Sequence, residues 1–160
     1  MDLNMFRISR LTDYGTLILV FLAGQERRLC SASEVATGTH VAQPTAQKLL
    51  KVLAKTGLVE SARGADGGYR LARNPALITT AEILDALDGP VAITECSTDD
   101  GDCVLEPLCQ VGSAWQKINS AIRVALSDIT LADLGHPQAN IPELDLTRNK
   151  DAHPTPVVDH

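Results

Sequence analysis

The strongest constraint on the fold is a glycine-rich turn flanked by two short patterns that are typical of β-strands. Residues 58–63 and 69–72 favour strands, and the Asp66-Gly67 step between them favours a tight turn with positive φ angles. This hairpin directly follows an amphipathic helix that is predicted over residues 44–56. The chain is therefore limited to folds in which a two-stranded hairpin extends from a helical body.

Three helices are predicted before the hairpin. The first, residues 9–24, has apolar residues at helical spacing that predict one buried face: Leu11, Tyr14, Ile18, Phe21 and Leu22. The second is short and begins with a capping box formed by Ser31 and Glu34. The third, residues 44–56, has an inward apolar stripe of Ala46, Leu49, Leu50 and Leu53. A short helix, a tight turn, a polar and basic second helix and a hairpin together outline a winged helix-turn-helix.

The charge of the chain is divided unevenly between its two halves. Residues 1–75 contain ten Lys and Arg against six Asp and Glu, a net charge of +4, although the whole chain has −6. Residues 76–160 contain four Lys and Arg against fourteen Asp and Glu, a net charge of −10. This asymmetry favours nucleic-acid binding by the first half, and a chance difference between solvated surfaces is the alternative.

The exposed side of the third helix and the base of the wing are the predicted DNA-binding surface. Side chains on the first exposed turn of such a helix contact bases, and nearby cations contact phosphates. An arginine at the wing can enter a narrow minor groove, and a glycine beside it leaves the tip free of bulky side chains. The predicted contacts are Thr45, Gln47, Lys48, Lys51, Arg63 and Gly64. The alternative is that they are ordinary solvated residues.

Two further helices are predicted after the hairpin. A capping box of Thr79 and Glu82 begins a helix over residues 80–88. A long helix follows over residues 113–128, and residues 129–134 form a final short turn. Apolar residues spaced by three and four positions give the long helix a heptad seam: Trp115, Ile118, Ile122, Ala125 and Ile129. This seam favours pairing with a second helix, and packing within its own domain is the alternative.

Three clustered cysteines, Cys96, Cys103 and Cys109, are candidate metal ligands. The chain has neither a secretory signal pattern nor an apolar run of the roughly 20 residues that cross a bilayer, so we expect a cytoplasmic protein without membrane contact. In the cytoplasm, three clustered thiolates suit an iron–sulfur cluster better than zinc, because the cysteines form no C-x-x-C pair and no histidine lies between them. Unrelated cysteines and a metal-free thiol switch remain alternatives. Cys30 stands alone.

An enzyme is not expected from these residues. No histidine is placed beside a cysteine as a base, and no redox C-x-x-C pair occurs.

Specific motifs resemble the Rrf2 family of bacterial regulators, which includes IscR and NsrR. The most specific is the RG-x-x-GGY-x-L wing within residues 57–71, and the resemblance covers residues 6–134. The opening residues 7–15 and the stretch 89–96 resemble most closely the branch that regulates SUF cluster-assembly genes.

The resemblance implies a homodimer that carries a 2Fe–2S or 4Fe–4S cluster, of which we favour 2Fe–2S, on Cys96, Cys103 and Cys109. It places Gln47 at a position important for operator choice and Arg63 at the wing arginine. The histidine ligand of IscR corresponds to Gly112, so that ligand is absent here. The aspartate ligand of NsrR corresponds to Asp13, which would be donated by the partner subunit. The alternative for Asp13 is a carboxylate that interacts with the helix dipole.

These observations predict a mainly α fold with a small β-hairpin wing and a long dimerisation helix. Residues 1–75 would form the DNA-binding domain, residues 76–134 the linker helix, cluster loop and dimerisation helix, and residues 135–160 a disordered tail. The expected function is a cluster-sensing repressor or dual regulator of SUF genes that binds a palindromic double-stranded operator. The alternative is a cluster-free dimer that acts by a thiol switch or by docking on a partner enzyme.

Overall fold

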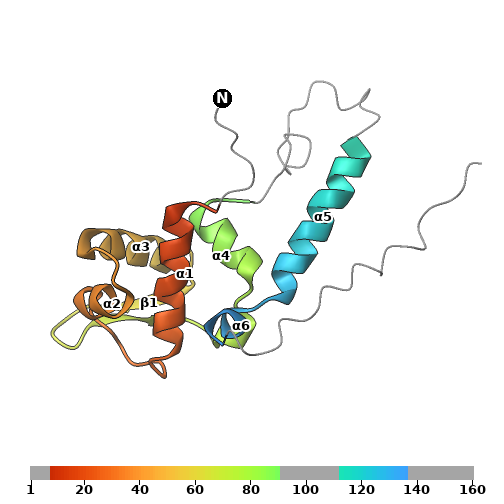
Figure 1. Cartoon of the computed structure of the whole chain (residues 1–160). Coiled ribbons are helices and arrows are strands. Elements are labelled where there is room, and N and C mark those ends of the chain that lie inside the picture. The colour runs from red at the N-terminus through yellow and green to blue at the C-terminus, as the bar shows by residue number, and fades with distance from the viewer. Residues whose placement is uncertain (1–7, 91–111, 137–160) are drawn as a thin grey trace, which may run out of the picture.

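The predicted order of helices and strands is confirmed in a computed structural model, which describes residues 8–90 and 112–136. The elements are α1 (Arg10–Ala23), α2 (Ala32–Thr39), α3 (Gln43–Lys55), β1 (Val59–Ala62), β2 (Gly68–Leu71), the 3-10 turn η1 (Pro75–Leu77), α4 (Thr80–Leu87), α5 (Gly112–Asp128) and α6 (Leu131–Gly135). Five helices (α1 to α4 and α6) and a hairpin form the main body, and the long helix α5 extends from one side of it (Figure 1).

The core lies where α1, α2 and α3 meet the inner side of the hairpin. All four residues of the predicted inward stripe of α3 are buried. They pack with residues from α1, α2 and the strands, which include Ile18, Leu19, Leu22, Val35, Val59 and Leu71. Each such side chain contributes about 1.5–3 kcal/mol when removed from water. This shared core fixes the position of α3 relative to the hairpin.

The predicted buried face of α1 is partly wrong. Leu11 and Tyr14 are 41% and 36% exposed, whereas Thr12 and Gly15 are buried. The reason is the close crossing of α1 and α4. A Cβ atom on Gly15 would lie 2.5 Å from Leu87 Cδ1, so a small residue at this point lets the helices approach. The first half of the inward face therefore consists of a small and a polar residue, which an apolar periodicity cannot reveal, and the apolar residues Ile18, Leu19 and Leu22 continue this face.

The predicted hairpin is confirmed, but its turn differs from the prediction. Val59 lies opposite Leu71, and Ala62 lies opposite Gly68. The five-residue connection is closed by a hydrogen bond from the Gly67 N–H to the Gly64 carbonyl at 3.0 Å. Positive φ occurs at Gly64 (106°), not at Asp66 or Gly67, because the connection is longer than a two-residue turn.

Cys30 extends the hairpin by one residue on its other side. Its N–H donates to the Tyr69 carbonyl at 2.9 Å, and the Tyr69 N–H donates back at 2.8 Å. The Cys30 side chain is fully buried, and this burial raises the pKa of its thiol. Cys30 therefore joins the hairpin to the segment that precedes α2.

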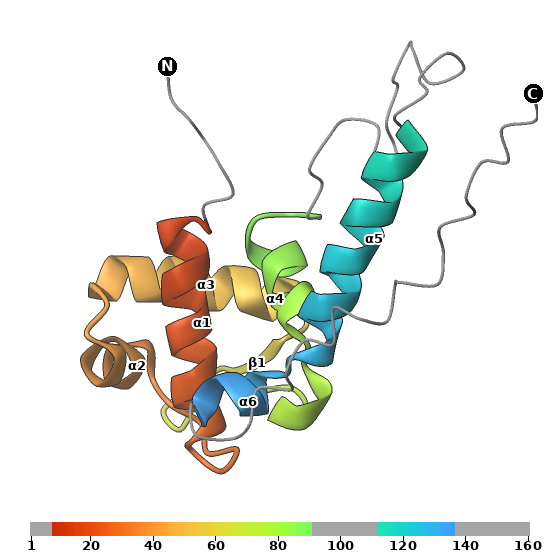
Figure 2. The ribbon, with the colours of Figure 1, turned by 45° about the vertical axis from the view of Figure 1, so that its right-hand side comes forward.

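Capping boxes begin three of the helices. The two predicted boxes, at Ser31 for α2 and at Thr79 for α4, are both confirmed. A third, at Thr130, begins α6, for which only a turn was predicted. The α6 helix lies beside α1 (Figure 2), and the Leu131 N–H donates to the Ile78 carbonyl at 2.8 Å.

The α2 capping box makes the stability of the main body depend on pH in the acidic range. Hydrogen bonds from the Ser31 N–H (2.7 Å) and then from Arg28 lower the pKa of Glu34 to about 2, from 4.5. A lowered folded-state pKa stabilises the fold above pH 4.5, and this contribution is lost as the pH falls towards 2. We expect the difference in Tm between wild type and Glu34→Gln, measured by circular dichroism, to shrink over this range. A constant difference would contradict this assignment.

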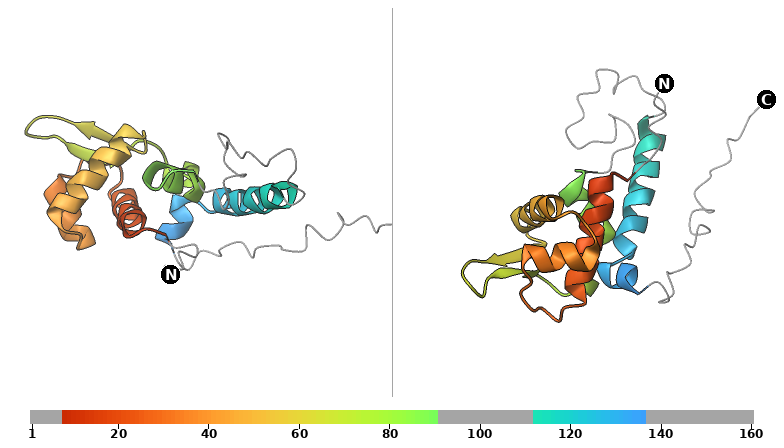
Figure 3. Two further views of the ribbon diagram at one scale, coloured as in Figure 1. Left: turned by 90° about the horizontal axis from the view of Figure 1, so that it is seen from above. Right: turned by 60° about the vertical axis from the view of Figure 1, so that its left-hand side comes forward.

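The α5 helix stands away from the main body (Figures 1 and 3), and α4 provides its attachment. Arg123 forms two hydrogen bonds with Asp85 of α4, at 3.1 and 2.6 Å. No side chain of α5 is fully buried. Within the described residues, no helix is long and apolar enough to span a membrane.

Candidate DNA-binding surface and sensing residues

The exposed side of α3 carries most of the predicted DNA contacts. Gln47, Lys48 and Lys51 are exposed, whereas Thr45 is half-buried. At 100° per residue, Lys48 and Lys51 lie near the middle of the outward face, and Gln47 and Thr45 lie on its two opposite flanks. A single approach of DNA therefore meets the lysines and Gln47 most directly.

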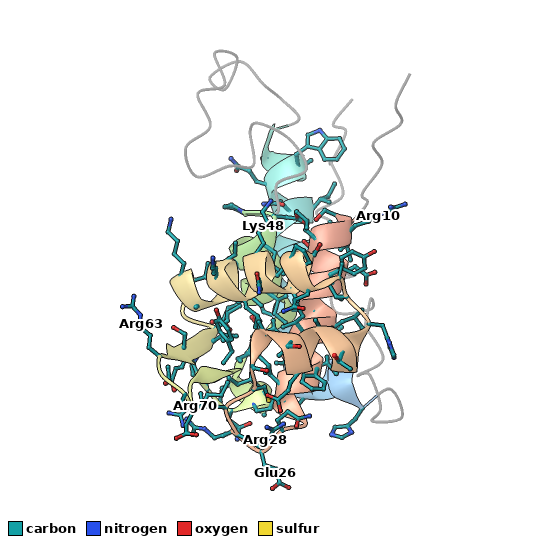
Figure 4. The ribbon with its side chains drawn as sticks, turned by 90° about the vertical axis from the view of Figure 1, so that its left-hand side faces the viewer. Arg10, Glu26, Arg28, Lys48, Arg63 and Arg70 are labelled. Atoms are coloured by element: carbon teal, nitrogen blue, oxygen red, sulfur yellow. The ribbon has the colours of Figure 1, made fainter. Side chains whose placement is uncertain are left out.

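The wing provides a second cation that points away from the body. Arg63 is exposed and extends outward from the end of β1 (Figure 4). Among the described residues it has no acidic partner, whereas Arg70 on the opposite strand donates from Nε to Glu60 at 2.9 Å. Gly64 is also exposed, and nothing lies within 4 Å of where its Cβ would be. The wing thus offers a free guanidinium beside an unobstructed backbone.

Helix α3 and the hairpin lie at the end of the molecule opposite α5 (Figures 1 and 3). The ion pairs found among the described residues involve Arg28, Arg70, Arg73 and Arg123, so none neutralises the lysines of α3 or Arg63. Unopposed cations on one surface attract a polyanion. Lys55 is also exposed on this face and was not among the predicted contacts, although its spacing from Lys51 indicates the same side.

The candidate sensing residues are only partly within the described structure. Cys96, Cys103 and Cys109 lie outside the described residues. Asp13 is exposed in the first turn of α1, and its carboxylate has no hydrogen-bond partner among them. An exposed carboxylate without a competing partner fits one oxygen ligand of a metal group. The residues described here therefore allow this role for Asp13 and supply no further ligand.

A polar cluster near Asp13 was not predicted. The Asp88 carboxylate accepts hydrogen bonds from the Ser9 hydroxyl at 2.7 Å and from the Thr12 hydroxyl. Partial burial raises the pKa of Asp88, but the hydrogen bonds from Thr12 and Ser9 outweigh it, so the pKa lies below its ordinary value. The cluster joins the first turn of α1 to the end of α4. No local pattern could have found a contact between residues 76 positions apart.

The proposed seam of α5 is unevenly exposed. Trp115 and Ile118 are exposed, and Ile122, Ala125 and Ile129 are half-buried. Gly112 is the first residue of the helix. Pairing of this seam with a second copy stays a prediction.

Comparisons with known proteins agree with this arrangement. The family model Rrf2, described as an iron-dependent transcriptional regulator, matches residues 8–137. The HTH-type transcriptional regulator NsrR of Bacillus licheniformis is 29% identical, over 86% of this chain and 98% of that protein. Protein aau3 of Rhizobium meliloti is 31% identical, over 84% of this chain and 89% of that protein.

Solved structures give the same result. CymR, the global cysteine regulator of B. subtilis, has a TM-score of 0.62 at 32% identity, over 82% of this chain and 97% of that one. IscR of T. potens has a TM-score of 0.59 at 31% identity, over 81% of this chain and 86% of that one. These relatives are regulators and not enzymes. The chain therefore belongs to the Rrf2 family of winged-helix transcriptional regulators.

Proposed function

We propose that this protein is an iron–sulfur-cluster-sensing regulator that controls SUF cluster-assembly genes from the cytoplasm. The observation that carries the proposal is the carboxylate of Asp13 on α1, the helix that packs directly on α2 and α3; this carboxylate is exposed and has no partner among the described residues. A ligand bound there would act on an element of the DNA-binding body itself. Similarity to proteins named IscR and NsrR, and the iron-dependent description of the family, support this proposal.

DNA recognition would use α3 and the wing. Gln47 is placed to read a base edge, and Thr45 lies at the flank of the same helix. Lys48, Lys51 and Arg63 would bind phosphates or a narrow minor groove, and Gly64 would allow close approach of the wing. Two such heads in a homodimer joined through α5 would fit a palindromic operator.

The metal group would be held by Cys96, Cys103 and Cys109 of one subunit and by Asp13 of the other. We favour a 2Fe–2S cluster. When bound, such a group supplies a redox-active centre that oxidants or iron limitation can remove. Asp13 contributes a carboxylate oxygen from the first turn of α1, a harder and weaker ligand for iron–sulfur clusters than a thiolate.

The test is to purify the protein anaerobically and to record its visible spectrum, its iron content and its binding to DNA. Cys103→Ala should abolish the absorption. Asp13→Ala should weaken metal retention by on the order of 10-fold. Asp128→Ala is the matched control, because it removes another exposed aspartate at the end of α5. A colourless, iron-free wild type would contradict the proposal, and unchanged retention in Asp13→Ala would exclude Asp13 as a ligand.

A cluster-free regulator is the second candidate, and the likeness to CymR of B. subtilis favours it. In this case the cysteines would form a thiol switch, or the dimer would dock on a partner enzyme. An iron-free wild type whose DNA affinity changes with a thiol oxidant, and no longer does so in Cys103→Ala, would identify the switch.

A further inference from the structure

Helix α4 connects the DNA-binding body to α5 through two carboxylates. Asp85 accepts hydrogen bonds from both terminal nitrogens of Arg123 on α5. Asp88 accepts hydrogen bonds from Ser9 and Thr12 at the start of α1. The direction of α5 relative to α3 therefore depends on how α4 is seated against α1, together with the packing of α6 on α1.

The contact between α1 and Asp88 is a three-part clamp, formed by Ser9, Thr12 and Asp88. The Asp88 carboxylate accepts from the Ser9 N–H at 3.5 Å, from the Ser9 hydroxyl at 2.7 Å and from the Thr12 hydroxyl. Thr12 is only 1% exposed, so its hydroxyl has no access to bulk water. The same Ser9 hydroxyl accepts from the Thr12 N–H at 3.1 Å and caps α1. The clamp thus fixes the end of α1 and the end of α4 together.

The packing beside the clamp sets how closely α1 and α4 approach. Leu87 lies over Gly15, where a Cβ atom would be 2.5 Å from its side chain. Directional hydrogen bonds to Asp88, the residue that follows α4, add a restraint on the rotation of the two helices about this point.

We propose that the clamp of Ser9, Thr12 and Asp88 sets the spacing between the two DNA-binding heads, so that these residues determine which operator spacing is bound. The inference rests on the proposed function, because it requires a dimer joined through α5 and an operator with two half-sites. A dimer reads two half-sites at a separation fixed by its own geometry. A change in the angle between α1 and α4 would move each α3 relative to α5 and so change that separation.

The experiment uses the full chain and palindromic duplexes that wild type selects from a randomised pool. The two half-sites are then moved apart or together by one and two base pairs, and affinity is measured by fluorescence anisotropy. Wild type should lose on the order of 10-fold in affinity for each shift, whereas Thr12→Val should bind all spacings within about threefold of one another. Valine keeps the shape of threonine and removes only the hydroxyl.

Thr16→Val is the matched control. It removes a hydroxyl one turn further along α1 that bonds only to the Thr12 carbonyl, at 2.8 Å, and it should keep the wild-type spacing profile. Asp88→Asn is the second variant, and it should flatten the profile as Thr12→Val does. Hydrogen exchange should also quicken in the first turn of α1 and the last turn of α4 in both clamp variants, but not in Thr16→Val.

The possible spacing profiles distinguish a failure of the clamp from a failure of the proposed function. A sharp profile in wild type that stays equally sharp in Thr12→Val and Asp88→Asn would overturn the clamp and leave the proposed function standing. An equal loss at every spacing would show structural damage and would also overturn it. A wild type that selects no duplex would overturn the proposed function and this inference with it.

Discussion

Replacing Lys51 and Arg63 together by alanine should lower affinity for duplex DNA by on the order of 100-fold near physiological salt. Both side chains are exposed, and neither has an acidic partner among the described residues, so each is free to displace a counterion from a phosphate. The slope of log affinity against log salt should fall by about 2, since two phosphate contacts are lost. Fluorescence anisotropy over a salt series measures both quantities.

The control for this prediction removes the same charge from cations that are already paired. Arg28 is bound to Glu34 and Arg70 to Glu60, both at 2.9 Å. Arg28→Ala with Arg70→Ala changes the net charge by the same amount but should reduce affinity much less, because each guanidinium is held by a carboxylate and is not available to contact a phosphate. An equal loss in the two double variants would mean that net charge, and not the surface of α3 and the wing, governs binding.

The elements that sequence predicted well are those whose signals are local. The capping boxes at Ser31 and Thr79 each involve residues three positions apart, and both form as expected. The inward stripe of α3 is equally local, because its spacing matches one helix face. The hairpin itself is also a local feature, because its two strands are joined by a short glycine-containing turn.

The features that could not be predicted from the sequence depend on contacts between residues far apart in the chain. The buried face of α1 is set by its crossing with α4 at Gly15 and Leu87, so the apolar pattern at Leu11 and Tyr14 was misleading. The contact of Asp88 with Thr12 spans 76 positions, and a threonine followed much later by an aspartate carries no signal. Tertiary packing decides such positions.

The positions of the DNA-binding side chains could be predicted from the sequence, but which of the cations are held in ion pairs could not. Arg63 and Arg70 lie seven residues apart on one hairpin, and both are cations that could reach DNA. Cross-strand pairing places Arg70 directly opposite Glu60, which neutralises it, whereas Arg63 has no acidic partner in the described part of the chain. Only the pairing of the two strands shows which arginine faces a carboxylate. It thereby separates Arg63, which we expect to contact DNA, from Arg70, which stabilises the hairpin.

Gly68→Ala should be strongly damaging and should destabilise the protein by about 3–4 kcal/mol. A Cβ atom at this position would lie 2.6 Å from the Cys30 carbonyl oxygen and 2.8 Å from its carbonyl carbon. Both atoms belong to backbone that is hydrogen-bonded to Tyr69, so neither can move without breaking the pairing of β2 with Cys30. Urea unfolding followed by circular dichroism measures the loss.

Gly64→Ala separates this steric effect from the general cost of removing a glycine from the wing. Gly64 has a φ of 106°, and nothing lies within 4 Å of its missing Cβ. Alanine there should cost only the backbone strain of about 1–2 kcal/mol. If the two variants lose the same stability, backbone conformation and not the approach of Cys30 is what requires glycine in the wing. If Gly68→Ala loses clearly more and also binds DNA less tightly, the junction of Cys30 with β2 is what holds Arg63 at the DNA-binding surface.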